Sequence, residues 1–384
     1  MLKKTLLFTL IFVLACSMLL GNFAYADDFN LKSKSAILMD ANTGKVLYEK
    51  NSHEELPPAS VTKVMTMLLV MEALDSGKIK ATDKVVTSEH AYDMGGTQIY
   101  LEVGEEMTVD DLLKSVAMNS ANDASVALAE YISGSEEKFV EEMNKRAKEL
   151  GAKNTNFKNA SGLPEDGHYT SVYDIALISR ELVKHKNVFK YLTDKIDSVR
   201  NGKFSLANTN KLLWNYQGAD GIKTGSTSEA LYCLSATAKR GDTRFIAVVF
   251  GAPDSATRFK EASKLLDYGF ANYETKKVVE AGKVYGSIKV LKGQQDYVNA
   301  ISNRDEYILL KKGEAKNIKQ IISLNKYIDA PVKAGSEIGT VKIYDGNNLI
   351  KTVSLISDKS VKKTTLFNTF EKIYKSWVKN TKSL

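Results

Sequence analysis

A serine and a lysine lie three residues apart at the start of a strongly apolar segment, PPASVTKVMTMLLVMEAL, which begins at residue 57. Residues three apart share one face of a helix, so the Ser60 hydroxyl and the Lys63 amine can meet. A serine hydroxyl becomes a good nucleophile only beside a base, and a lysine serves as that base only if burial lowers its pKa from about 10.4. The spacing therefore predicts a serine nucleophile with a lysine base. A lysine that extends from a helix edge into water fits the same pattern.

A second stretch, NSAN, places Ser120 and Asn122 between two segments with helical spacing. A loop between helices can direct both side chains into a cleft, where a serine can relay a proton and an asparagine can hydrogen-bond a substrate amide. An ordinary interhelical turn, in which Asn122 or Asp123 caps the next helix, explains the same residues. The stretch alone leaves both interpretations open.

A third stretch, DGIKTGS, places Lys223, Thr224 and Gly225 at the entry to a strand. A lysine and a hydroxyl can together bind a carboxylate, and a glycine lets another backbone approach closely. An exposed turn before a strand is the alternative. No stretch is specific by itself, but the three in this order, on helix, loop and strand, form a specific combination.

The combination S-x-x-K, S-x-N and K-T-G is that of the penicillin-binding proteins and serine β-lactamases. The sequence resembles this superfamily, and most of all the low-molecular-mass D-alanyl-D-alanine carboxypeptidases. The resemblance extends over nearly all of the chain after residue 26. It includes PPASVTKVMT, NSANDASVALAE, NASGLPEDGHYTS, DGIKTGST, the helix with Arg258, a small β domain and an amphipathic tail.

The resemblance implies a role for each residue of the first two motifs. Ser60 is the acylated nucleophile and Lys63 is its general base. Ser120 passes the proton to the leaving D-alanine, and Asn122 holds the amide on the acyl side of the substrate. No metal or other cofactor is implied.

The third motif is implied to bind the substrate. Lys223 and Thr224 engage the region of the terminal carboxylate, and Gly225 belongs to the same strand. The backbone N–H groups of Ser60 and Ser226 resemble an oxyanion hole, in which one donor is typically worth about 3–4 kcal/mol. Arg258 matches an arginine near the substrate carboxylate, although a surface helix arginine is the alternative.

The sequence also departs from its relatives in the groove. Ser226 stands where relatives often carry histidine, which matters little because the oxyanion contact uses the backbone. Thr209 stands where some relatives carry an arginine, so fine substrate preference stays open. Gly96 and Leu163 match positions that line the groove in related enzymes. The four histidines lie in polar contexts, and we expect them at the surface or in loops.

The segments around the motifs predict an antiparallel sheet built from both ends of one domain, with a helical lobe beside it. This is the α/β architecture of the transpeptidases and β-lactamases. A strand–turn–strand unit is expected at 36–48, strands at 231–239 and 243–252, and helices at 59–74, 107–118, 123–134, 136–150, 171–185 and 254–274, the last ending near Gly269. Short strands after residue 276, clearest at 339–355, predict a small all-β domain.

The first 26 residues have the pattern of a secretory signal peptide. Two lysines precede an apolar run, and Ala24-Tyr25-Ala26 is a small-x-small cleavage site. A lipoprotein site at Cys16 is the alternative. After cleavage one cysteine, Cys233, remains, which excludes an internal disulfide framework. We therefore expect an exported protein divided into residues 1–26 as signal, 27–275 as the peptidase domain, 276–360 as a β-sandwich and 361–384 as an anchor helix.

The last segment has one apolar helical stripe surrounded by lysines. The formal net charge of the chain is +7, and most of it comes from residues 359–384, so the body has no basic character that would indicate nucleic-acid binding. Such a tail is typical of a helix lying in a membrane interface, and a helix docked on the protein itself is the alternative. Its apolar residues are Leu366, Phe367, Phe370, Ile373, Tyr374, Trp377 and Val378.

The sequence thus predicts a membrane-attached serine DD-carboxypeptidase that removes the terminal D-alanine from peptidoglycan stem pentapeptides and is inhibited by β-lactam antibiotics. A DD-endopeptidase and a β-lactamase are the enzyme alternatives. The E-x-x-L-N pattern of class A β-lactamases is absent, since the Leu324-Asn325 pair has Ile321 in place of the glutamate. A penicillin-binding sensor or wall-binding protein is the non-enzyme alternative.

Overall fold

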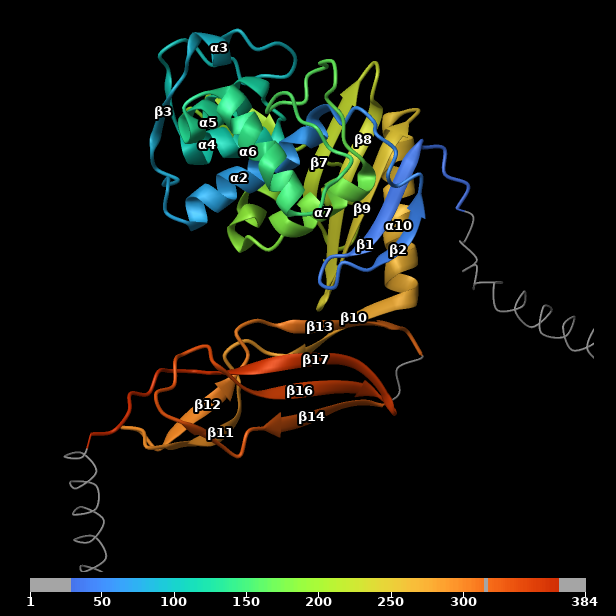
Figure 1. Ribbon diagram of the computed structural model, residues 1–384. Helices are drawn as coiled ribbons and strands as arrows, with labels where there is room; N and C mark the ends of the chain where they lie inside the picture. Colours follow the sequence, from blue (N-terminus) through green and yellow to red (C-terminus); the bar gives the residue numbers. More distant parts are fainter. Residues whose placement is uncertain (1–28, 314–316, 366–384) are drawn as a thin grey trace, which may run out of the picture.

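A five-stranded antiparallel sheet forms the centre of the larger body in the computed structural model, which describes residues 29–313 and 317–365 (Figure 1). Its strand order is β2-β1-β9-β8-β7, so strands from both ends of this body lie next to one another. β9 is buried along its whole length. The arrangement confirms the sheet predicted from the sequence. Its strands are β1 (Ser35–Asp40), β2 (Val46–Lys50), β7 (Ala219–Thr227), β8 (Leu231–Arg240) and β9 (Thr243–Ala252).

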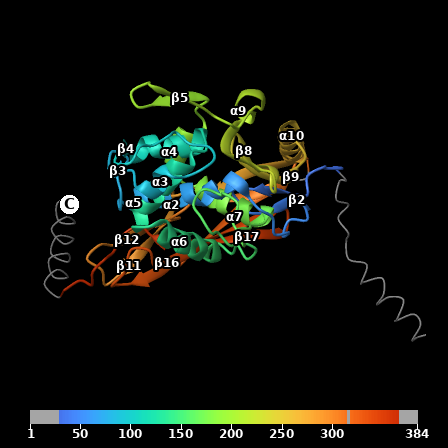
Figure 2. The ribbon, with the colours of Figure 1, turned by 90° about the horizontal axis from the view of Figure 1, so that it is seen from above.

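The helical lobe covers one face of this sheet and α10 (Ser255–Asn272) covers the other (Figure 2). α2 (Lys63–Asp75) lies in the middle of the lobe, where apolar neighbours surround it on all sides. That burial explains why its sequence has no polar face. The other helices are α3 (Glu89–Tyr92), α4 (Val109–Met118), α5 (Asn122–Ser133), α6 (Glu136–Glu149), α7 (Val172–Leu182), α8 (Phe189–Leu192) and α9 (Leu212–Asn215).

Short elements connect these helices and strands. A 3-10 helix, η1 (Ala59–Thr62), immediately precedes α2, and a second one, η2 (Lys186–Val188), precedes α8. Two small antiparallel pairs lie at the outside of the lobe. They are β3 (Lys84–Val86) with β4 (Glu106–Thr108), and β5 (Ile196–Val199) with β6 (Phe204–Ala207).

The helix α10 does not end near Gly269, as the sequence suggested, but continues to Asn272. A Cβ atom at position 269 would lie 2.9 Å from the ring of Phe245. Glycine is therefore present because the helix packs closely on β9, and it does not terminate the helix. The prediction of the helix end at this glycine was wrong.

An all-β body follows, below the larger body in Figure 1. A two-stranded sheet, β10 (Tyr273–Val279) with β13 (Glu306–Lys311), packs through a shared apolar core on a six-stranded sheet. At the junction, the Thr275 hydroxyl donates a hydrogen bond to the Asp40 carboxylate at 2.8 Å. The six strands are β11 (Val284–Leu291), β12 (Tyr297–Ile301), β14 (Ile318–Leu324), β15 (Tyr327–Asp329), β16 (Glu337–Asp345) and β17 (Asn348–Ser357).

The predicted signal segment and the apolar stripe of the predicted anchor helix lie outside the described residues. Among the helices that the structure does describe, none is both long enough and apolar enough to cross a membrane.

Candidate active site

The start of α2 brings Ser60 and Lys63 together. Ser60 lies in η1, where residues three apart are eclipsed, and Lys63 is the first residue of α2. The Lys63 Nζ and Ser60 Oγ atoms are 3.1 Å apart. The serine is partly exposed, whereas the lysine side chain is fully buried. The pair is therefore open to a substrate at the hydroxyl and closed to water at the amine.

Lys63 has two further oxygen neighbours from other parts of the chain. Its Nζ lies 2.6 Å from Asn122 Oδ1 and 2.5 Å from the carbonyl oxygen of Ser161. Burial, assisted by the nearby charge of Lys223, holds the pKa of Lys63 well below its usual value, and Asp123 opposes this shift. A neutral amine has two hydrogens and one lone pair. When the two oxygens accept those hydrogens, the lone pair is left for the Ser60 hydroxyl.

Ser120 and Asn122 lie at the junction of α4 and α5, as the sequence predicted. Ser120 has a positive φ of 67°, and its hydroxyl is buried without a hydrogen-bond partner in the described part of the chain. The Asn122 amide nitrogen donates to the Gly95 carbonyl at 2.7 Å. That nitrogen carries two hydrogens, so one remains for a substrate carbonyl. An unsatisfied buried hydroxyl two residues before Asn122, whose side chain contacts Lys63, is suited to a proton-relay role.

The K-T-G strand, β7, forms the opposite wall. Lys223 is buried, and burial together with the charge of Arg258 lowers its pKa to about 7. Its Nζ donates to the Thr224 carbonyl at 3.1 Å, and the Thr224 hydroxyl lies 2.7 Å from the Thr209 hydroxyl. The described contacts of Lys223 are thus fewer than those of Lys63. A carboxylate bound here would restore the charged form of Lys223.

Gly225 explains how this strand reaches the nucleophile. A Cβ at this position would lie 2.9 Å from the Pro58 carbonyl oxygen and 3.0 Å from the Ser60 amide nitrogen. Any side chain would force the strand away from η1. The close approach places Ser226, the next residue of β7, beside the segment that contains Ser60, as an oxyanion hole built from their two N–H groups requires.

Arg258 lies behind this strand. Its guanidinium donates to the Gly225 carbonyl at 2.9 Å and to the Cys233 carbonyl at 3.2 Å, so it joins β7 to β8. The side chain is buried and also stacks on Phe259. The structure therefore shows a bracing contact for Arg258, and its contact with a substrate carboxylate stays a prediction.

A loop at residues 159–168 closes the site on the side of α6, and sequence reasoning gave it no role beyond Leu163. It supplies the Ser161 carbonyl to Lys63. A Cβ at Gly162 would lie 1.9 Å from the Ala59 carbonyl oxygen, and one at Gly96 would lie 2.8 Å from the Asn122 amide nitrogen and 3.5 Å from Leu163. These glycines allow the loops to pack against the motifs.

His168 is the exception among the histidines because it is buried. The Lys158 N–H donates to its Nδ1 at 3.1 Å, so its Nε2 carries the proton and donates to the Thr62 hydroxyl at 2.8 Å. Burial, with the charges of Lys158 and Lys63, lowers its pKa to about 4. It is therefore a neutral structural link between the loop and η1.

Asp123 also has a role that its sequence position did not reveal. Its carboxylate is fully buried and accepts hydrogen bonds from the N–H groups of Ile99, Leu101 and Ala124. It thereby holds the loop at residues 95–101 against the start of α5. The described residues contain no group of three or more His, Cys, Asp or Glu side chains that could hold a metal ion.

Comparisons with known proteins agree with this geometry. Residues 22–254 match the family described as D-alanyl-D-alanine carboxypeptidase, and residues 273–363 match the C-terminal domain of penicillin-binding protein 5. The chain belongs to the D-alanyl-D-alanine carboxypeptidase family. Its activity is that of a serine-type D-alanyl-D-alanine carboxypeptidase, an enzyme of cell-wall metabolism.

The relatives of this carboxypeptidase match over most of its length. The D-alanyl-D-alanine carboxypeptidase DacF of Bacillus subtilis is 48% identical over 352 residues, which are 91% of this chain and 90% of that protein. The crystal structure of penicillin-binding protein 5 from Haemophilus influenzae has a TM-score of 0.72 and 36% identity and covers 87% of this chain and 98% of that one. The structure of penicillin-binding protein D2 from Listeria monocytogenes with ampicillin bound has a TM-score of 0.58 and 35% identity. It covers 62% of this chain and 98% of that one.

Proposed function

We propose that Ser60 is acylated by the penultimate D-alanine of a stem pentapeptide with Lys63 as its base. The observation that carries this proposal is the arrangement of three oxygens around the Lys63 amine, which leaves its lone pair for the Ser60 proton. Ser60 Oγ bonds to the carbonyl carbon as its proton moves to Lys63 Nζ. The backbone N–H groups of Ser60 and Ser226 stabilise the negative charge that develops on the carbonyl oxygen.

Collapse of this intermediate breaks the bond to the terminal D-alanine. The leaving nitrogen takes the proton from Lys63 through the Ser120 hydroxyl, and free D-alanine departs. Asn122 holds the acyl-side amide, while Lys223 and Thr224 hold the terminal carboxylate. Water then attacks the ester, and Ser60 is regenerated. A penicillin enters the same reaction because its strained amide resembles D-alanyl-D-alanine, and its ring-opened acyl group stays on Ser60.

Intact-mass spectrometry after incubation with penicillin tests the nucleophile. We expect one added penicillin per chain, mapped to Ser60 by peptide analysis. A Ser60→Ala variant should keep its fold and gain no mass, because it lacks the hydroxyl that lies 3.1 Å from the buried Lys63 amine. Retention of the adduct in that variant would contradict the assignment. Release of D-alanine from a pentapeptide, with no cleavage of a cross-linked dimer, separates the carboxypeptidase from the endopeptidase.

We infer that the enzyme works on the outer face of the cytoplasmic membrane, held there by residues 361–384. The family acts on peptidoglycan outside the cytoplasm, and the apolar stripe flanked by lysines supports an interfacial anchor. Deleting residues 363–384 should release the protein from anionic vesicles and leave hydrolysis of a soluble peptide intact. The double variant Phe370→Asp, Trp377→Asp should also be released. Continued pelleting of that variant would favour a tail docked on the protein.

A further inference from the structure

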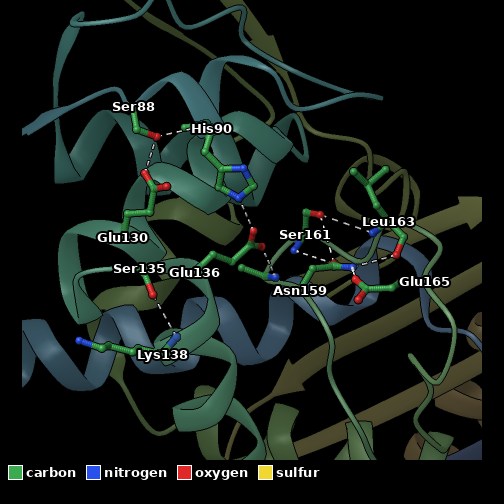
Figure 3. Close-up of polar contacts among 12 residues, drawn as sticks. Ser88, His90, Glu130, Ser135, Glu136, Lys138, Asn159, Ser161, Leu163 and Glu165 are labelled. Carbon is green, nitrogen blue, oxygen red and sulfur yellow. Dashed lines mark hydrogen bonds and ion pairs between the residues drawn. The ribbon is translucent and has the colours of Figure 1, made fainter.

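Glu136 is a buried carboxylate that the reaction described above does not use. It is the first residue of α6 and 9% exposed. Figure 3 shows it between His90 and the loop that carries Ser161. One carboxylate oxygen accepts a hydrogen bond from the Ala160 N–H at 2.8 Å, and the other lies 2.8 Å from His90 Nε2. The side chain thus joins the loop at residues 159–168 to two parts of the helical lobe.

The peptide groups on either side of Ala160 are fixed to different elements. The Ala160 N–H is held by Glu136, and the Ala160 carbonyl accepts a hydrogen bond from the Thr66 hydroxyl at 2.7 Å. Thr66 lies on α2, three residues after Lys63 and on the same face. The next carbonyl along the chain, that of Ser161, is the one that receives Lys63 Nζ. Glu136 therefore binds the residue that immediately precedes Ser161, whose backbone oxygen orients the amine.

Asn159 organises the same loop in a different way. Its side-chain oxygen accepts from the Gly162 N–H at 2.7 Å, and its nitrogen donates to the Leu163 carbonyl and to Glu165. These bonds join the loop to itself and set its shape, and those to Leu163 and Glu165 are drawn in Figure 3. They do not set where the loop lies relative to α2. That placement depends on bonds to other elements, such as those made by Glu136 and Thr66.

We propose that Glu136 is a positioning residue for acylation: through the Ala160 N–H it keeps the Ser161 carbonyl on Lys63, so that the lone pair of the amine faces Ser60. The inference rests on the proposed role of Lys63 as the base. A carboxylate in the first turn of a helix also favours the helix itself, and that general effect would not act on the chemical step alone.

The test compares Glu136→Ala with Glu136→Gln and with the matched control Glu137→Ala. Glu137 is the exposed neighbour in the same helical turn, so its removal costs the helix the same charge. We expect Glu136→Ala to lower kcat for a pentapeptide and the rate of acylation by a fluorescent penicillin by roughly 10- to 100-fold, because a small misplacement of a catalytic group has effects of this order. KM should stay near its original value, since the carboxylate-binding residues lie on β7.

Glu136→Gln keeps an oxygen that can accept from the Ala160 N–H and should recover most of the rate, while Glu137→Ala should behave like the unmodified enzyme. An alanine variant with normal acylation, or a glutamine variant as slow as alanine, would overturn the inference. If Glu136→Ala does not fold, Thr66→Val decides. It removes the other bond to the same residue with little change in shape, and a normal kcat in that variant would count against the mechanism.

Lys63→Arg is measured in the same series to separate the two proposals. If Lys63→Arg still acylates at a normal rate, Lys63 is not the base and the proposed function fails. If Lys63→Arg is inactive and Glu136→Ala is normal, the proposed function stands and the positioning role fails.

Discussion

The two buried lysines of the site lie in different regions and are surrounded very differently. At the start of α2, Lys63 has oxygen neighbours from η1, from α5 and from the loop at residues 159–168. On β7, the described polar contact of Lys223 is the backbone carbonyl of Thr224. Both amines have lowered pKa values because both are buried. The comparison teaches that burial alone does not define the role of a lysine. The acceptors around Lys63 orient its amine to take the Ser60 proton, whereas Lys223 has few acceptors and can bind an anion.

Replacing the base should have the largest effect. Lys63→Arg keeps a positive charge but cannot lose its proton at ordinary pH. We expect acylation by penicillin to fall by several orders of magnitude, on the scale seen when the base of a serine enzyme is removed. Circular dichroism should show an unchanged fold. Near-normal acylation would mean that Lys63 is structural and that the contrast between the lysines has been assigned the wrong way round.

Replacing the anion-binding lysine should have a smaller and more selective effect. Lys223→Gln should raise KM for a peptide with a free terminal carboxylate by about 10- to 100-fold, as expected when a charged hydrogen bond to substrate is lost. The same variant should treat the methyl ester of that peptide much as the unmodified enzyme does. Equal loss for both substrates would show that Lys223 does not recognise the carboxylate charge.

The pH dependence of the unmodified enzyme offers a control for that selectivity. Since the pKa of Lys223 is lowered to about 7 in the free enzyme, the amine is charged below that pH and becomes neutral above it. KM for the carboxylate substrate should therefore rise as the pH increases through about 7, and KM for the methyl ester should not. Flat KM values for both substrates between pH 6 and pH 9 would contradict the lowered pKa.

The smallest effect is expected at Thr209, whose hydroxyl lies 2.7 Å from that of Thr224. Thr209→Val removes this contact and keeps the shape of the side chain, so Thr224 loses a partner that fixes its orientation. We expect KM for the carboxylate substrate to rise by about two- to fivefold, the order of one neutral hydrogen bond. Thr209→Ser should leave KM unchanged. A rise in the serine variant as large as in the valine variant would indicate packing as the cause.

The helix, loop and strand that carry the three motifs could be predicted from the sequence, because each depends on a local pattern. Apolar spacing placed the helix after Ser60, and the split between two helical segments placed Ser120 in a loop. The order of strands and helices also predicted the antiparallel sheet and the all-β domain, both of which are confirmed. The helix end at Gly269 was missed, because the close packing on Phe245 that requires a glycine is not visible in local sequence.

Contacts between distant segments could not be predicted in this way. Nothing in the sequence around Ser161 shows that its carbonyl meets Lys63, 98 residues earlier. Glu136 reads as an ordinary acidic residue in the first turn of a helix, and its bond to Ala160 depends on how the loop folds back. Arg258 shows the opposite case, since its position was singled out by resemblance and the structure places its guanidinium on main-chain carbonyls.

The strand order of the central sheet has a consequence for when activity can arise. β1 pairs with β9, so residues near 37 must wait for residues near 248 before the sheet can close. Contacts between such distant segments form slowly because a long loop must first be ordered. Because the chain is made from its N-terminus, Ser60 and Lys63 are present long before β7 arrives beside them. The nucleophile therefore stays idle until the whole domain has been made and folded.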